Sequence, residues 1–238
     1  MQLTAPLRTA RRRLGLSRDK SGVAMMEFAF TLPLVLYLSL YGMEVANLAL
    51  ANMRVSQAAL NLADNASRVG LDTGLPVMQL REVDINDALA GARRFGAGFM
   101  LAEKGRITVS SLYTDASGQR IQWQRCLGLK RGAGWDSSYG TTGVNSLTDD
   151  SAANKGTLRP QGMGPTGSVV DAPLNTGVVF VEINYEYQPL IGLTWINGRK
   201  ARLHYIASFI VRDRRDFTQI HNPAPQAARY TCDKYTKE

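Results

Sequence analysis

The sequence predicts an α+β protein, in which a long N-terminal helix carries a globular head with a short helix and an antiparallel sheet. Residues 23–43 form an almost uninterrupted apolar run, and helical periodicity continues beyond it to Val69. Further along, short segments alternate apolar and polar residues, as strands do. The 238-residue chain therefore divides into a basic leader over 1–22, a long helix over 23–70 and a head over 71–238.

The apolar run is the first element. As a helix, Val23–Met43 would be roughly 30 Å long, which matches the hydrocarbon core of a bilayer. It is too long for the core of a secretory signal, and no A-x-A cleavage site follows it, so we expect it to remain as an anchor. Asp19 is the one acid before the run, against six basic residues. These are Arg8, Arg11, Arg12, Arg13, Arg18 and Lys20. The imbalance predicts a cytoplasmic N-terminus and a translocated head.

Glu27 is the anomaly of this segment. A carboxylate inside a membrane-length apolar run costs about 2.5–3.5 kcal/mol on insertion scales, so we expect it to serve a purpose. The alternative is an incidental glutamate near the interface whose carboxylate reaches the lipid headgroups.

The start of the anchor resembles a known family. Gly22, four further residues and then Glu27-Phe28 resemble the G-x-x-x-x-E-F/Y cleavage signature of type IV prepilins, in particular their Flp/Tad branch. The resemblance implies that a prepilin peptidase cuts between Gly22 and Val23, which places Glu27 at the fifth mature position. The size and ending of the body resemble TadE/TadF-type minor pilins (pseudopilins). That part of the resemblance depends on Trp123–Cys126, Val181–Pro189 and Cys232.

The resemblance implies a structural subunit of a Flp/Tad-type pilus, involved in its assembly, initiation or tip, and no enzyme. The implied partners are the prepilin peptidase, other pilins and pseudopilins through the N-terminal helix, the Tad inner-membrane assembly machinery and the lipid bilayer. No cofactor and no nucleic acid is implied. The implied location is the bacterial inner membrane, crossed once with the head in the periplasm, or an extracellular pilus.

Glu27 also has a physical role that does not depend on the family. Cleavage after Gly22 would create a positive α-amino group at Val23, one helical turn away on the same face. The carboxylate could neutralise that group, or it could pair with the amino group of a neighbouring subunit. Because an unpaired buried charge is heavily penalised, pairing between subunits would fix their axial register.

Pro33 interrupts the backbone hydrogen bonding of the same helix, and we expect a kink there. The kink could soften the helix for extraction from the membrane, or it could be a packing feature.

Beyond Gly42 the helix continues with apolar residues at three- and four-residue steps, the spacing of a helix–helix seam. They are Val45, Leu48, Asn52, Val55, Ala59, Leu62, Ala66 and Val69. We also expect part of this stripe to pack against its own head. Gly70, followed by Gly74 and Pro76, predicts the end of the helix.

In the head, Asp84 is the expected N-cap of a second helix. Its apolar face is predicted to be Ile85, Ala88, Leu89, Ala92, Phe95 and Phe99. Four strands are then expected, over Ile107–Tyr113, Arg120–Leu127, Val178–Gln188 and Ala201–Asp213. One face of each of the last three strands is predicted to be buried. Those faces are Ile121, Trp123 and Leu127; Val179, Val181, Ile183, Tyr185 and Tyr187; and Leu203, Tyr205, Ala207, Phe209 and Val211. Asn197-Gly198 is a turn signal between the last two.

A Gly/Ser/Thr-rich excursion is predicted over residues 128–177. Trp135 and Tyr139 within it are expected to pack locally rather than to form a contact site. The run Gly162–Gly167 satisfies G-x-G-x-x-G, but no strand precedes it, no helix follows it and Pro165 removes a donor. A dinucleotide site is therefore rejected.

Cys126 and Cys232 are the two cysteines. In a translocated, oxidising compartment they most simply form one disulfide that pins the C-terminal tail to the second strand. A reactive or metal-binding pair is the alternative, but neither cysteine has a nearby histidine or second cysteine. No metal site is predicted.

Enzyme motifs are missing from the sequence. His204 and His221 have no metal-ligand spacing, and Asp115-Ala116-Ser117 starts like a metal-dependent adhesion motif but lacks its second serine. The net charge of +8 falls to about +3 without the leader, too little to indicate nucleic acid. The alternative function is a signal-anchored extracytoplasmic binding protein that keeps its leader and does not assemble. An anchored hydrolase would lack a nucleophile–base pair.

Overall fold

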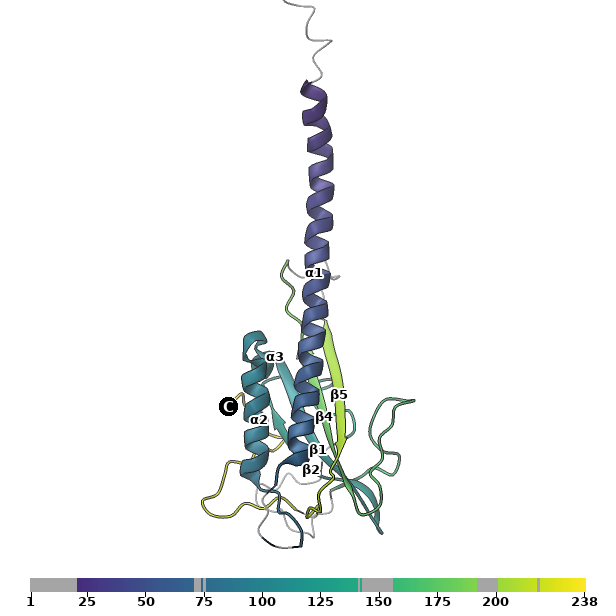
Figure 1. The fold of residues 1–238 in the computed structure, drawn as a ribbon, viewed down its shortest axis with the longest axis vertical. Coiled ribbons are helices and arrows are strands. Elements are labelled where there is room, and N and C mark those ends of the chain that lie inside the picture. Colours follow the sequence, from purple (N-terminus) through teal and green to yellow (C-terminus); the bar gives the residue numbers. More distant parts are fainter. Residues whose placement is uncertain are drawn as a thin grey trace, which may run out of the picture. The chain divides into compact units, whose positions relative to one another are not determined.

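The computed structural model describes residues 21–70, 74, 76–140, 142, 156–191, 201–217 and 219–238. The chain divides into two compact units, Met1–Ala46 and Asn47–Glu238. Most of the predicted leader and the Asn197-Gly198 turn signal lie outside the described residues. Figure 1 shows the course of the chain.

Helix α1 runs from Ser21 to Arg68 and confirms the long helix expected from the sequence. It continues unbroken through Pro33, and a kink at that residue stays a prediction. In the first unit its apolar side chains are exposed, with Met25 and Phe30 each 76% accessible. Among the described residues it is the one helix whose length and composition would allow it to cross a membrane.

The second unit contains a five-stranded antiparallel sheet in the order β3-β2-β1-β4-β5. Its strands are β1 (Gly105–Asp115), β2 (Gly118–Leu127), β3 (Thr157–Leu158), β4 (Gly177–Glu186) and β5 (Arg202–Ile210). The four longer strands confirm the sequence prediction. Strand β3 was not predicted, because two residues are too few to show an alternating pattern.

Three short helices follow α1: α2 (Glu82–Gly96), η1 (Ala97–Phe99) and α3 (Leu101–Lys104). The prediction that Asp84 is the N-cap of α2 is wrong, because that position is Arg81. Asp84 lies three residues further on, and its Oδ2 accepts a hydrogen bond of 3.0 Å from the Arg81 amide. A carboxylate at this position satisfies a free amide of the first turn, which explains the misassignment.

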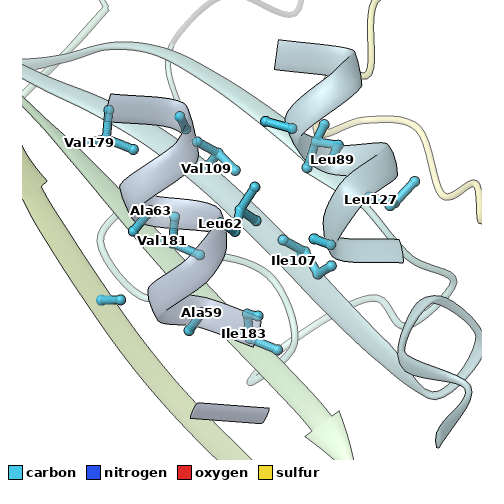
Figure 2. Packing of buried hydrophobic residues seen from close by; sticks show 14 of the residues in the cluster. Ala59, Leu62, Ala63, Leu89, Ile107, Val109, Leu127, Val179, Val181 and Ile183 are labelled. Atoms are coloured by element: carbon cyan, nitrogen blue, oxygen red, sulfur yellow. The ribbon is translucent and has the colours of Figure 1, made fainter. Parts of the chain in front are cut away.

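The part of α1 within the second unit and helix α2 cover the same face of the sheet. Figure 2 shows Leu62 of α1 and Leu89 of α2 over Ile107 of β1, with Val181 of β4 beside them. Ala59 and its small neighbours on α1 let the helix lie close to the strands. The C-terminal part of the stripe predicted as a helix–helix seam is therefore core packing within the head, from Val55 to Ala66.

A register shift changes the faces of β2. Strand β1 pairs Ser111 with Trp123 but Leu112 with Ile121, so β2 has one extra residue between these two pairs. The extra residue turns the side chains on its two sides to opposite faces of the sheet. Ile121 was expected to lie on the same face as Trp123. Instead it belongs to a second apolar cluster on the other side of the sheet, so that prediction is wrong. This cluster comprises Leu112, Ile121, Met163, Ala172, Val178 and Phe180.

The described parts of the excursion pack onto that second side of the sheet. The Tyr139 ring lies edge-on to Phe180, with 5.3 Å between ring centroids, and Met163 and Ala172 complete the cluster. Tyr139 therefore packs locally, as expected. On α2, Phe95 departs from the prediction of a buried face, since it is 43% exposed near the end of the helix.

Candidate functional site

The first two turns of α1 carry the residues of the predicted cleavage and assembly site. Gly22 is exposed, a side chain added to it would meet no atom within 4 Å, and Val23 is 54% accessible. Glu27 lies one turn beyond Val23 on the same helical face, and Phe28 beside it is 62% exposed. Within the first unit the site is therefore open along its whole length.

Local hydrogen bonding supports the helix ahead of Pro33. The Thr31 hydroxyl donates to the carbonyl oxygen of Glu27 at 2.9 Å and lies 3.3 Å from that of Phe28. Such bonds keep the polar side chain satisfied inside an apolar helix, because the backbone supplies the acceptor.

In the second unit, two asparagines attach α1 to the sheet. The Asn47 amide donates to the Tyr187 hydroxyl at 2.7 Å, and the Tyr205 hydroxyl donates to Asn52 Oδ1 at 2.8 Å. Both pairs lie between α1 and the β4–β5 part of the sheet. Asn52 belongs to the packing stripe predicted from the sequence, but its tyrosine partner was not predicted. An asparagine inside an apolar stripe was the available signal.

The opposite side of this part of α1 carries a second row of residues at helical spacing, which was not predicted. Leu50, Met53 and Leu60 are 48%, 56% and 47% exposed, and Gln57 continues their three- and four-residue steps. The row is offset by two residues, or about 200°, from the buried stripe. Both rows have the same spacing, so periodicity alone could not show which one would be buried.

The face of the sheet away from the helices is polar and buried over much of its area. Its charged and polar side chains alternate along the strands with those of the core. They are Arg106, Thr108, Ser110, Gln124, Glu182, Asn184 and Glu186. Two segments supply their partners: residues 128–140, and the C-terminal tail over 229–238, which we call the tail.

Arg106 is the centre of this polar face and is fully buried. Its guanidinium donates to the carbonyl oxygens of Gly128, Cys232 and Lys234 at 3.1, 2.6 and 2.8 Å. Its Nε lies 3.3 Å from Asp136 Oδ1. Burial lowers the pKa of Arg106, and the carboxylate of Asp136 opposes that shift. The arginine thus joins the first residue after β2 to the tail.

Glu182 and Asn184 form hydrogen bonds with the segment 128–140. Burial raises the pKa of Glu182, while hydrogen bonds from the Ser137 hydroxyl and the Ser138 amide oppose the rise. Asn184 donates to the Trp135 carbonyl oxygen at 2.9 Å. These contacts fix the segment across the sheet. The centre of the Trp135 ring lies 5.1 Å from Lys130 Nζ of the same segment, which agrees with the expectation that Trp135 packs locally.

Cys126 and Cys232 form the disulfide expected from the sequence, with their Cα atoms 4.8 Å apart. The tail then continues along the end of β2. The Cys126 amide donates to the Tyr230 carbonyl oxygen at 2.7 Å, and the Gly128 amide donates to that of Thr236 at 2.6 Å. The covalent bond and the backbone bonds hold the tail at the same place.

A buried ion pair on the helix side was not anticipated from the sequence. Arg125 Nε donates to Glu82 Oε2 at 2.9 Å, and Arg229 Nε lies 3.8 Å from Glu82 Oε1. Glu82 is fully buried at the start of α2. The pair joins the first turn of α2, strand β2 and the tail, and charge alternation gave no sign of it because its members lie far apart in sequence.

The other sequence motifs considered above make ordinary structural contacts. Asp115 Oδ1 accepts the Ser117 amide at 2.7 Å in the β1–β2 turn, and Met163 pairs with Val170 in a short bridge. His204 Nδ1 is 2.8 Å from Asn184 Oδ1. Within the described part of the chain, no group of three or more His, Cys, Asp or Glu residues could hold a metal ion.

Comparisons of the chain with protein-family models, with curated proteins and with solved structures found no match.

Proposed function

We propose that this chain is a minor pilin or pseudopilin of a Flp/Tad-type pilus, cut after Gly22 by a prepilin peptidase and anchored in the inner membrane by Val23–Met43. The observation that carries the proposal is the composition of α1. One 48-residue helix begins with exposed apolar turns that include Glu27, and its last turns form part of the core of the head.

The exposed apolar side chains of the first unit are those of a helix that lies in a nonaqueous environment. Large apolar side chains such as Met25 and Phe30 are exposed on it, which soluble proteins avoid over such a length. Cleavage would place a positive amino group on Val23, and Glu27 would be its nearest acid along the same face. In an assembly, the carboxylate would select the axial position at which a neighbouring amino group neutralises it.

The exposed row on the second unit adds a surface for packing against other subunits. Leu50, Met53 and Leu60 continue the helical spacing outside the membrane-length segment. Because α1 is fixed to the sheet through Asn47 and Asn52, this row keeps a set orientation relative to the head.

A signal-anchored extracytoplasmic binding protein is the second candidate function. The same exposed apolar helix would serve it, and the buried polar face with its disulfide would suit a translocated domain. The two candidates differ in whether the leader is removed and whether Glu27 is needed.

The N-terminus of the membrane-extracted chain tests the proposal, and intact mass is the measurement. We expect a mature form that begins at Val23 in cells with an active prepilin peptidase. Gly22→Leu should abolish it, and since no atom lies within 4 Å of an added Cβ, the substitution itself causes no clash within the described residues. A chain that keeps its leader in such cells would contradict the proposal and favour the anchored binding protein.

Glu27→Ala separates assembly from anchoring. It should leave membrane insertion intact and reduce recovery of the subunit in sheared pili or assembly complexes by tenfold or more, on the order of 1.4 kcal/mol or greater. Glu103→Ala is the matched control, because it removes a partly exposed carboxylate from the head. Equal recovery of both variants would contradict a register role for Glu27.

A further inference from the structure

A polar cavity lies beside the disulfide, between the second face of the sheet and the tail. Its volume is about 240 Å³. Its lining includes Thr108, Cys126, Asp136, Thr231, Asp233 and Tyr235. The floor comes from β1 and β2, and the tail supplies Asp233 and Tyr235, which are exposed.

The cavity contains hydrogen-bonding capacity that the protein does not use. Thr231 is only 6% exposed and lines the cavity, and its hydroxyl has no hydrogen-bond partner among the described residues. Asp136 Oδ1 is buried, and among the described residues its contact is the ion pair with Arg106 Nε at 3.3 Å, which leaves one of its lone pairs for a further donor. The Thr108 hydroxyl lies 3.4 Å from Cys126 Sγ, a weak acceptor. Buried polar atoms without partners are rare in folded proteins, and an ordered water, an ion or a ligand normally satisfies them.

The charges around the cavity select against ions. The carboxylates of Asp136 and Asp233 disfavour an anion at its mouth. The guanidinium of Arg106, next to Asp136, opposes a second positive charge there. An uncharged molecule that both donates and accepts hydrogen bonds meets neither penalty.

The lining also matches the chemistry of hydroxyl groups. A carboxylate oxygen accepts only, whereas a threonine hydroxyl donates or accepts, so a ligand hydroxyl can satisfy either. Tyr235 adds an aromatic ring whose hydroxyl is already bound to Asp136 Oδ2 at 3.2 Å. The volume lies below the range of drug-sized pockets, which limits the ligand to a single small ring.

From these contacts we infer that the cavity is a binding site for a neutral polyhydroxyl ligand, namely one sugar unit. Thr231 and Asp136 bind its hydroxyl groups and Tyr235 borders its entrance. The site belongs to the head alone and does not depend on pilus assembly.

The test uses the full chain in phosphatidylcholine nanodiscs, because detergents with sugar headgroups would compete for the cavity. D-galactose, D-mannose and N-acetyl-D-glucosamine are titrated separately and followed by saturation-transfer NMR. We expect saturable binding of at least one sugar, with a dissociation constant on the order of 1 mM. Thr231→Val should weaken it by about three- to tenfold, the effect of one hydrogen bond.

Thr231→Val is a favourable variant, because the hydroxyl it removes has no partner in the described part of the chain. Its loss should shift the thermal midpoint by no more than a few degrees. Thr176→Val, outside the cavity, is the matched control and should bind like the wild type. Three results would each overturn the inference: no saturable binding of any of these sugars up to about 50 mM, unchanged affinity in Thr231→Val, or saturable Ca²⁺ binding in place of sugar binding.

Discussion

At the scale of single residues, buried charges decide how the tail is held. Arg106 is fully buried and donates to three carbonyl oxygens, two of them on the tail. The interaction is favourable because a charged donor binds several acceptors at once, which offsets the cost of burying it. The sequence could not show this, because an arginine in a strand is ordinarily an exposed residue.

Arg106→Met should lower the free energy of unfolding by about 3–5 kcal/mol, because the apolar side chain leaves three carbonyl groups without their donor and Asp136 without its ion-pair partner. Urea unfolding of the full chain in micelles measures the change. Arg94→Met provides the control, since Arg94 is exposed on α2 and its replacement should cost no more than about 0.5 kcal/mol. Similar losses in the two variants would mean that Arg106 does not hold the tail.

Glu182 makes stability depend on pH. Burial raises its pKa above the ordinary value of 4.5, so above that pH the folded state binds more protons than the unfolded state. Its contribution is therefore complete below the unfolded pKa and is lost as pH rises through the folded pKa. Glu182→Gln should remove this decline, which begins above about pH 4.5. At pH 7 it should be at least as stable as the wild type, because glutamine still accepts the Ser138 amide.

The difference between the unfolding curves of the wild type and Glu182→Gln, measured at a series of pH values, isolates this effect. His204 contributes in the opposite direction. Burial lowers its pKa, so its contribution to stability is lost as pH falls through the folded-state pKa. That contribution is present in both proteins and cancels. Glu238→Gln, at an exposed site, should reproduce the wild-type curve. A constant difference across the pH range would contradict the assignment to Glu182.

At the scale of elements, the end of α1 depends on a residue distant in the sequence. Arg215 is 4% exposed, and its guanidinium donates to the carbonyl oxygens of Ala66 and Ser67 at 3.3 and 3.0 Å. These are among the carbonyl groups that a helix leaves without internal partners, and a cation there also interacts favourably with the helix dipole. Sequence signals predicted the end of the helix within two residues but could not identify this partner.

Arg215→Met should reduce the free energy of unfolding by about 1.5–3 kcal/mol, because two carbonyl groups lose a charged donor. It should also raise amide hydrogen exchange in the last turn of α1. Arg214→Met is a close control, since the neighbouring side chain is exposed and should be replaceable at little cost. If both variants unfold at the same urea concentration, Arg215 does not stabilise the helix end.

The two rows on α1 show where periodicity stops being informative. The existence and length of the helix followed from its apolar repeat, and so did the four longer strands. Burial of part of the row with Val55 was also expected and is confirmed, although the row with Met53 has equal spacing and periodicity alone does not separate the two. Small residues distinguish them in retrospect: the row with Ala59 and Ala66 permits close approach to the sheet, whereas the row with Met53 and Leu60 would hold it away.

At the scale of the whole molecule, the head has one apolar and one largely polar sheet face. The apolar face follows from alternation in the strands, which the sequence showed. The polar face has the same alternation but is buried by residues 128–140 and the tail, whose course depends on contacts between distant residues. For this reason the cysteine pair could be predicted from composition and compartment, whereas the cavity beside it could not.

The disulfide should therefore contribute to the stability of the whole head. It joins residues 106 positions apart, and closing a loop of this length in the unfolded chain corresponds to about 4–5 kcal/mol in the loop-entropy model. The Cys126→Ala/Cys232→Ala double variant should lose a stabilisation of this order in urea unfolding. Under reducing conditions, the stability of the wild type should fall toward that of the variant. Because Arg106 and the backbone bonds of Tyr230 and Thr236 also hold the tail, we expect the variant to remain folded. Limited proteolysis should then release the tail before it cuts the sheet. Equal stability of the oxidised and reduced wild type would show that the noncovalent contacts alone determine the position of the tail.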